Sequence, residues 1–225
     1  LIQAIVSQRE IKSKEELEEI EKAVNTTVDM HVTAMQMVRP GLLERDIVAE
    51  VEKIVKNVGG NTSFPTIATV HGEIMHNHYH GNVLLDGDMF LLDCGAETGM
   101  GYAGDLSSTM PIGKSFSTRQ KEIYAITLEA HDASIAMLKP GRPFQEIHLQ
   151  ACRIIIEGLK DLGIMKGDSE GALDSGAHAL FFPCGLGHQM GLDAHDMENL
   201  GEEYVGYDGS PKSTQFGLKS LRLGK

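Results

Sequence analysis

The sequence is poor in cysteine and basic residues, and these shortages exclude several classes of protein. Its three cysteines, Cys94, Cys152 and Cys184, are odd in number, widely spaced and without a CxxC pair, so neither a disulfide scaffold nor a structural zinc site is indicated. Lys and Arg total 20 against 32 Asp and Glu, which gives a formal net charge of -12. We therefore expect no nucleic acid and no anionic membrane as a main partner, because both require a basic face.

Long apolar runs are also missing. No stretch approaches the roughly 20 apolar residues that cross a bilayer. The sequence begins at Leu1 without Met and without a signal-like segment, so residues that precede it could be missing. These features predict a cytoplasmic protein. Its 225 residues, 41% of them hydrophobic, suffice for one large domain or two small ones.

An internal repeat is the clearest structural pattern. The segment MVRPGLLERDI (37–47) recurs in register as MLKPGRPFQEI (137–147), with Pro-Gly at the centre of each. Before the first turn, Ser13 and Glu16 predict a helix capping box, and apolar residues follow at helical spacing. Those residues are Leu17, Ile20, Ala23, Val24 and Val28. Each half therefore reads as helix, Pro-Gly turn, helix, with Pro143 in the first turn of its helix.

Strand patterns follow mainly in the first half. Residues 62–70, 89–95 and 105–112 each predict a strand, whereas in the second half only 179–192 resembles a strand with turns. Residues 198–225 read as a loop. We expect an α/β (α+β) protein of two pseudo-symmetric halves, about 13–112 and 117–225, with at least one strand pair missing from the second.

Two aspartates and two histidines are the main candidates for metal ligands. Asp93 ends the apolar run FLLD and Asp105 begins the next strand, so both carboxylates could face one point, as hard divalent cations require. His188 and His195 lie in the glycine-rich segment GLGHQMGLDAHD, where Asp196 could fix the tautomer of a histidine ligand. Taken singly, each of these residues could equally be an exposed polar side chain.

Two other patterns are weaker. The segment HNHYH places His76, His78 and His80 at alternate positions, but nothing nearby adds ligands, and we interpret His78 and His80 as loop residues. Cys184 precedes His188 by a few residues, yet no feature of the sequence would lower the pKa of its thiol. A thiol nucleophile is therefore not favoured.

Three stretches resemble the methionine aminopeptidase/prolidase superfamily, and within it the Xaa-Pro aminopeptidases: MHNHYHGNVLLDGDMFLLDCGAE, GYAGDLSSTMP and GLGHQMGLDAHDMENLGE. The resemblance implies the pita-bread fold, in which two αβ halves with antiparallel strands hold two divalent metal ions, Mn most readily, with Co, Zn or Fe as alternatives. It also implies hydrolysis of the bond before a proline at the second position of a peptide, and a homo-oligomer for the complete protein.

The resemblance assigns roles to individual residues. It implies that Asp93, Asp105 and His188 bind metal, and that His76 and His195 hold the substrate carbonyl and the developing tetrahedral centre. Cys184 stands where relatives often carry a histidine near the proline pocket. The family also uses two glutamates, in motifs similar to V-E-P-G and R-x-E, which this sequence lacks. We therefore expect an incomplete, truncated domain with little activity of its own.

Three alternatives stay open. Prolidase, which cleaves only dipeptides, would share these ligands. Methionine aminopeptidase is less favoured, because Asp-Met-Glu follows His195 where Glu-Glu-Pro is usual. The chain could also be an inactive pita-bread binding module, since a fold does not fix a function.

Overall fold

The computed structural model describes residues 1–198 and 204, and these form two compact units. The sheet unit contains Arg9–Ser117 and Gln189–Met197. Of the described residues, the helical unit contains Leu1–Gln8, Thr118–His188, Glu198 and Tyr204. Helix α1 (Ile2–Glu10) spans the boundary between the two units in the sequence.

Two helices begin the sheet unit. Helix α2 (Lys14–Met37) starts at the predicted capping box, and helix α3 (Glu44–Asn57) buries the apolar residues Ile47, Val51 and Val55. The predicted apolar face of α2 is only partly correct, because Ala23 is buried but Leu17 and Val28 are exposed. The buried residues of the helix are Ala23, Thr27, Met30, His31 and Ala34. Apolar residues occur all round this helix, so only its contacts with the sheet decide which face is buried.

The sheet unit contains two antiparallel sheets. In one, strand β3 (Met89–Cys94) lies between β2 (Ile67–Thr69) and β5 (Leu106–Pro111), which confirms the predicted strands at 89–95 and 105–112. In the other, β1 (Asn61–Thr62) pairs with β4 (Ala96–Glu97). The single strand predicted at 62–70 is wrong. Pro65 lies between β1 and β2, and its missing N–H prevents a continuous ladder.

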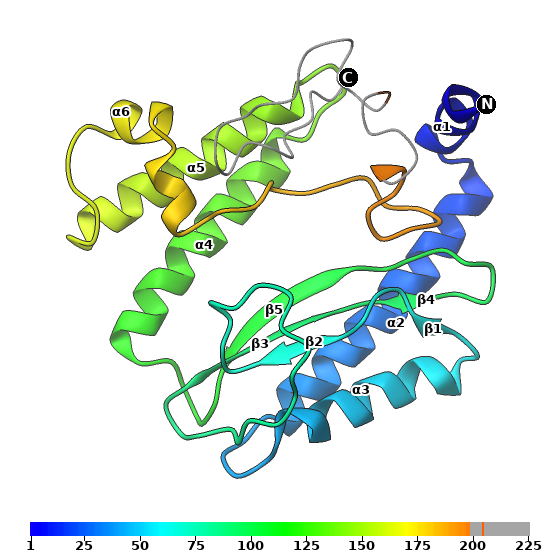
Figure 1. Cartoon of the computed structure of the whole chain (residues 1–225), viewed down its shortest axis with the longest axis horizontal. Helices are drawn as coiled ribbons and strands as arrows, with labels where there is room; N and C mark the ends of the chain where they lie inside the picture. The colour runs from blue at the N-terminus through cyan, green and yellow to red at the C-terminus, as the bar shows by residue number, and fades with distance from the viewer. Residues whose placement is uncertain (199–203, 205–225) are drawn as a thin grey trace. The chain divides into compact units, whose positions relative to one another are not determined.

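Strand β3 separates the core from the opposite face of the sheet. Phe90, Leu92 and Cys94 are buried in the core, whereas Met89, Leu91 and Asp93 are only partly buried. The core is completed by residues of α2, which runs behind the sheet in Figure 1, and of α3, which lies below the sheet in that view. Because successive side chains of a strand point to opposite faces, this alternation places Asp93 on the face away from the core.

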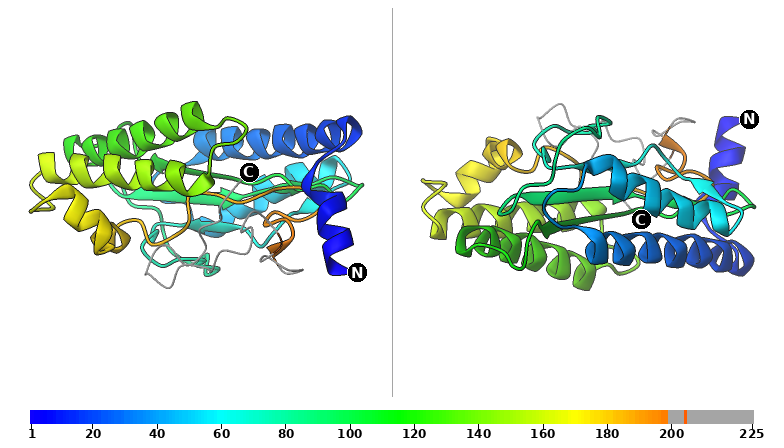
Figure 2. Two further views of the ribbon diagram at one scale, coloured as in Figure 1. Left: turned by 90° about the horizontal axis from the view of Figure 1, so that it is seen from above. Right: turned by 90° about the horizontal axis from the view of Figure 1, so that it is seen from below.

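The helical unit is built on α4 (Thr118–Met137) and α5 (Phe144–Asp161), which run side by side in both views of Figure 2. A short helix α6 (Ser169–Asp174) and a 3₁₀ turn η1 (Ala177–Leu180) follow. Pro143 caps α5 from the position before its first residue, not from within the first turn as predicted. Gly163, with φ 69°, follows the end of the helix as expected.

The strand predicted at 179–192 is wrong. Residues 177–180 form η1, and the described chain from 181 to 197 contains no strand. Pro183 and three glycines disfavour a ladder there, and a strand forms only where a partner offers its hydrogen bonds. The loop predicted from 198 onward, and any strands beyond it, lie outside the described residues. Within residues 1–198, none of the helices combines the length and hydropathy that a bilayer span requires.

Candidate functional site

Asp93 and Asp105 lie on one face of the sheet. Asp93 pairs directly with Ser107 of β5, and Cys94 pairs with Leu106. Asp105 precedes β5 and is two residues from Ser107, so it shares the face of Asp93 as a diagonal neighbour. Such neighbours lie about 7 to 8 Å apart, so both carboxylates could contact one cation or two adjacent cations. The expectation that two strand ends would present both carboxylates together agrees with this register.

The charge around this face is strongly negative. Burial, together with the charges of Asp93, Asp105 and Glu52, raises the pKa of the Cys94 thiol to about 12. Cys94 itself points into the core, where its sulfur lies 3.4 Å from Nε2 of His31. A concentration of carboxylates of this kind is the environment that a bound divalent cation stabilises.

Two glycines allow the segments around the aspartates to pack closely. A Cβ on Gly95 would come closer than 3.0 Å to the carbonyl oxygen of Gly104, and one on Gly104 would meet Thr27 and Ala23 of α2. The Ser63 hydroxyl donates to the Gly104 carbonyl at 2.7 Å, which ties down the residue before Asp105. The sequence analysis missed these supports, because a glycine that permits close approach looks the same as a turn glycine.

The segment 189–197 brings His195 to the aspartates. One ligand atom of His195 and one of Asp105 lie within 4.8 Å of each other, and the His195 side chain is exposed. Asp196 is 1% exposed. Its Oδ1 accepts a hydrogen bond from Arg9, and its Oδ2 accepts one from Lys12 at 3.0 Å. These two cations fix Asp196, whereas its action on a histidine tautomer stays a prediction.

Arg9 also donates to Asp193 at 2.9 Å, so it links two acids of the His195 segment. Burial opposes the charge of the Arg9 guanidinium, but hydrogen bonds with Asp193 and Asp196 and their charges together raise its pKa. The sequence analysis did not identify Arg9 or Lys12. They are far from Asp196 along the chain, and no local pattern signals the contact.

His76 lies on a loop that a buried carboxylate holds at both ends. Glu44, 0% exposed, accepts hydrogen bonds from the backbone N–H of Val70 at 2.8 Å and of Asn82 at 3.0 Å. His76 is exposed and has φ 53°, a left-handed conformation uncommon outside glycine. A strained, exposed histidine on an anchored loop is typical of functional positions. Glu44 was another residue that the sequence analysis missed.

The other two histidines of HNHYH do not form a metal site with His76 in the described structure. Nε2 of His80 lies 3.1 Å from the carbonyl oxygen of Thr66, and His78 is exposed. Their interpretation as loop residues agrees with these positions.

His188 and Cys184 belong to the helical unit. His188 is half-buried and is the last residue of that unit before the chain continues as Gln189 of the sheet unit. The Cys184 side chain is exposed, and partial burial of its thiol raises the pKa. A raised pKa keeps the thiol protonated at neutral pH, which argues against its use as a nucleophile.

Comparison with known proteins gives one consistent family. The model of metallopeptidase family M24 matches residues 18–216. The chain is 35% identical over 200 residues to an Xaa-Pro aminopeptidase of Escherichia coli, covering 87% of this chain and 45% of that relative. It is 32% identical over 207 residues to Xaa-Pro aminopeptidase 2 of Streptomyces coelicolor, covering 90% and 44%. The chain thus spans less than half the length of these relatives.

Solved structures of similar proteins indicate the same family. A variant of Escherichia coli aminopeptidase P in complex with substrate matches with a TM-score of 0.83 at 36% identity, over 86% of this chain and 44% of that one. Proline aminopeptidase P II from Yersinia pestis matches with a TM-score of 0.84 at 32% identity, over 97% and 47%. The mixed helices and antiparallel sheets are those of the pita-bread fold. The chain therefore belongs to metallopeptidase family M24.

Proposed function

We propose that the protein containing this chain is a metal-dependent aminopeptidase that hydrolyses the bond between an N-terminal residue and a following proline. The observation that carries the proposal is the shared sheet face of Asp93 and Asp105, with a ligand atom of His195 within 4.8 Å of one of Asp105. Relatives named Xaa-Pro aminopeptidase, and an aminopeptidase P structure with the inhibitor Pro-Leu, support the substrate class.

The donor set fits divalent metal ions. Carboxylates of Asp93 and Asp105, joined by the imidazole of His188, would hold them, and two ions, with Mn preferred over Co, Zn or Fe, form part of the proposal. An aminopeptidase P structure with substituted Zn shows that a relative accepts a second kind of metal. Bound ions of this kind polarise a carbonyl and lower the pKa of bound water.

The two exposed histidines, His76 and His195, could contact a bound substrate. His76, on the loop fixed by Glu44, and His195, next to the fixed Asp196, would donate hydrogen bonds to the substrate carbonyl as negative charge develops on it. Donors that are held in place before the reaction lower its barrier, because they need no reorganisation in the transition state. Cys184 is proposed to line the proline pocket, where a thiol would contact an apolar ring.

Partners and location follow as further parts of the proposal. The substrates would be peptides with proline at the second position, and the complete protein a homo-oligomer. None of Cys94, Cys152 and Cys184 forms a disulfide, which suits a reducing compartment such as the cytoplasm.

The test uses the protein encoded by the complete natural gene, supplied with Mn²⁺. It should release the first residue of an Xaa-Pro-Xaa tripeptide, and Asp105→Asn should lower kcat/KM by about 10³-fold or more, since a carboxylate that would hold metal is lost. The matched control Asp132→Asn, an exposed acid on α4, should leave the rate unchanged. Cleavage of dipeptides alone would favour prolidase. Failure to cleave either substrate would favour an inactive binding module.

A further inference from the structure

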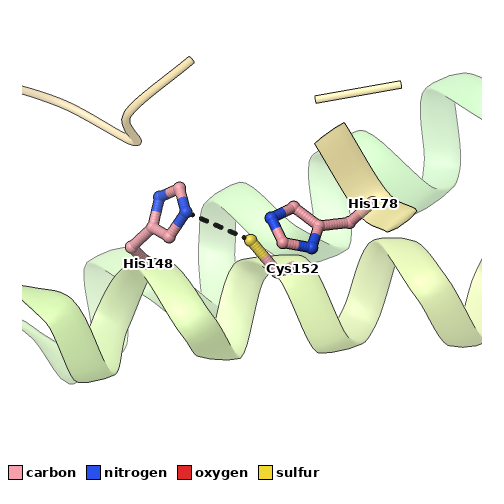
Figure 3. A group of neighbouring side chains, drawn as sticks. All are labelled: His148, Cys152 and His178. Carbon is pink, nitrogen blue, oxygen red and sulfur yellow. Dashed lines mark hydrogen bonds between the residues drawn. The ribbon is translucent and has the colours of Figure 1, made fainter. Parts of the chain in front are cut away.

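A second group of metal-binding side chains lies in the helical unit and has no part in the proposed peptidase site. His148 and Cys152 are one turn apart on α5, and His178 lies on η1. All three are 0% exposed. Each offers a ligand atom, and these atoms lie within 4.8 Å of one another. In Figure 3, the sulfur of Cys152 lies between the two imidazole rings.

His178 lacks the partners that a buried imidazole requires. Neither Nδ1 nor Nε2 of His178 has a hydrogen-bond partner among the described residues. Buried polar atoms in folded proteins almost always have such a partner, so an orphaned ring that faces a thiol and a second imidazole calls for an explanation. A cation held by the three side chains would use a nitrogen of His178 that the protein alone leaves without a partner.

The chemistry of the donors selects the kind of cation. Two imidazole nitrogens and one sulfur suit Zn²⁺ or other borderline and soft ions, and do not suit Mg²⁺ or Ca²⁺, which prefer oxygen. Within the part of the chain that the structure describes, no Asp or Glu joins this group. The carboxylates of Asp93 and Asp105 therefore favour harder cations than the group of His148, Cys152 and His178 does.

Metal binding at His148 requires a change in the hydrogen bonds of its ring, and this change opposes binding. Leu186 donates its backbone N–H to Nδ1 of His148 at 3.2 Å, so the proton of the neutral ring lies on Nε2, 3.3 Å from the sulfur of Cys152. Metal binding through Nε2 requires that proton to move to Nδ1, with loss of the bond from Leu186. A donor left without its acceptor changes an equilibrium by about 5- to 150-fold, whereas structural zinc binds with many orders of magnitude in its favour.

The protonation states are compatible with this exchange. Burial and the neighbouring His178 lower the pKa of His148 to about 4, so the ring is neutral at physiological pH. Burial raises the pKa of Cys152 to about 12 in the metal-free protein. A coordinating cation displaces the thiol proton, which leaves to solvent as the sulfur–metal bond forms.

We propose that His148, Cys152 and His178 form a three-ligand site for a zinc-class cation that ties α5 to the segment around η1. The spacing within α5 brings both of its ligands to one helix face. The third ligand comes from a turn whose neighbour Phe182 stacks on His148 at 5.4 Å between ring centroids. The site is thus preorganised by packing on two sides.

The test uses the complete gene product, stripped of metal and titrated with Co²⁺ as the probe. A thiolate–cobalt charge-transfer band distinguishes this site from the proposed peptidase ligands, which include no thiolate, and the Cys152 variant assigns the band to this thiol. We expect the band in the wild type and its loss in Cys152→Ser. Zn²⁺ affinity at this site should fall by more than about 100-fold, since losing even an outer partner of a ligand costs about 10–100-fold. Mn²⁺-dependent peptidase activity should persist.

Cys94→Ser is the matched control, because Cys94 is a buried thiol beside one histidine, His31, and belongs to no three-ligand group in the described structure. It should keep the band. If Cys152→Ser fails to fold, His178→Gln provides the same test and should also lose the band. Absence of the band in the wild type, or its persistence in both ligand variants, would overturn the proposal.

Discussion

At the scale of single residues, the buried carboxylate of Glu44 connects the start of α3 to the loop that carries His76. One side chain accepts hydrogen bonds from both ends of that loop, at Val70 and Asn82. The Nδ2 of Asn82 adds a third donor at 3.0 Å. Because every oxygen of the carboxylate is directed at a donor, the loop depends on the charge state and geometry of a single group.

We predict that Glu44→Gln lowers the free energy of unfolding by about 1–3 kcal/mol, since the amide NH₂ must face a backbone N–H and leave it unsatisfied. Glu50→Gln, an exposed acid of the same helix paired with Lys53, should change it by less than about 0.5 kcal/mol. Urea unfolding followed by circular dichroism measures both. Equal effects in the two variants would contradict the anchoring role.

Single residues also differ in whether the sequence alone allows their place in the candidate site to be predicted. Asp93 and Asp105 were identifiable because each sits at a strand boundary within a specific motif. Arg9 and Lys12, which bind Asp196, were not identifiable, because a single basic residue in a sequence carries no information about its distant partner.

At the scale of elements, close approach between strands and α2 positions the aspartates. Gly95 and Gly104 lie where an added Cβ would meet backbone or α2. Thr27 of α2 accepts a hydrogen bond from the N–H of Ala96 at 2.9 Å, which fixes the helix against the start of β4. The distance between Asp93 and Asp105 therefore depends on residues that bind no metal.

Gly95→Ala should destabilise the fold by about 1–3 kcal/mol, as overpacking does in close-packed regions, and should weaken metal binding at Asp93 and Asp105. Gly99→Ala is the control, since nothing lies within 4 Å of its Cβ position. The readouts are the urea midpoint and the affinity for Mn²⁺. A Gly95→Ala variant with unchanged values for both would show that the turn has room to adjust.

Pattern-based assignment of elements succeeded where the apolar pattern was unbroken, as in α3 and β3. It failed at 179–192, where alternating apolar residues and glycines resemble a strand but the described structure has none. A helix satisfies its own backbone, whereas a strand requires a partner that local sequence does not supply.

At the scale of the whole molecule, buried neutral histidines occur in both compact units. Burial lowers the pKa of His31 in the sheet unit, and lowers that of His148 in the helical unit to about 4. The ordinary pKa of an unfolded histidine is about 6.5, so between these values the unfolded chain binds more protons than the folded one. Stability is therefore complete above about pH 6.5 and falls as the pH decreases toward 4.

We predict that the metal-free protein loses on the order of 1–3 kcal/mol of stability between about pH 7 and pH 4 from these two histidines. His31→Gln and His148→Gln should each flatten the dependence, because glutamine does not titrate. His131→Gln, an exposed residue on α4, should leave it unchanged. Denaturant unfolding at stepped pH measures the slopes. Stability that is constant or rises on acidification would contradict the prediction.

The sequence by itself determined the family, the peptidase motifs and most helices and strands of the sheet unit. Those features depend on local periodicity, caps and short motifs, all of which lie within short stretches of the sequence. Tertiary structure alone decided which face of α2 is buried, how Glu44, Arg9 and Lys12 hold the candidate site, and that His148, Cys152 and His178 meet. The physical reason is that these contacts join residues far apart along the chain, and their energies depend on burial that exists only after folding.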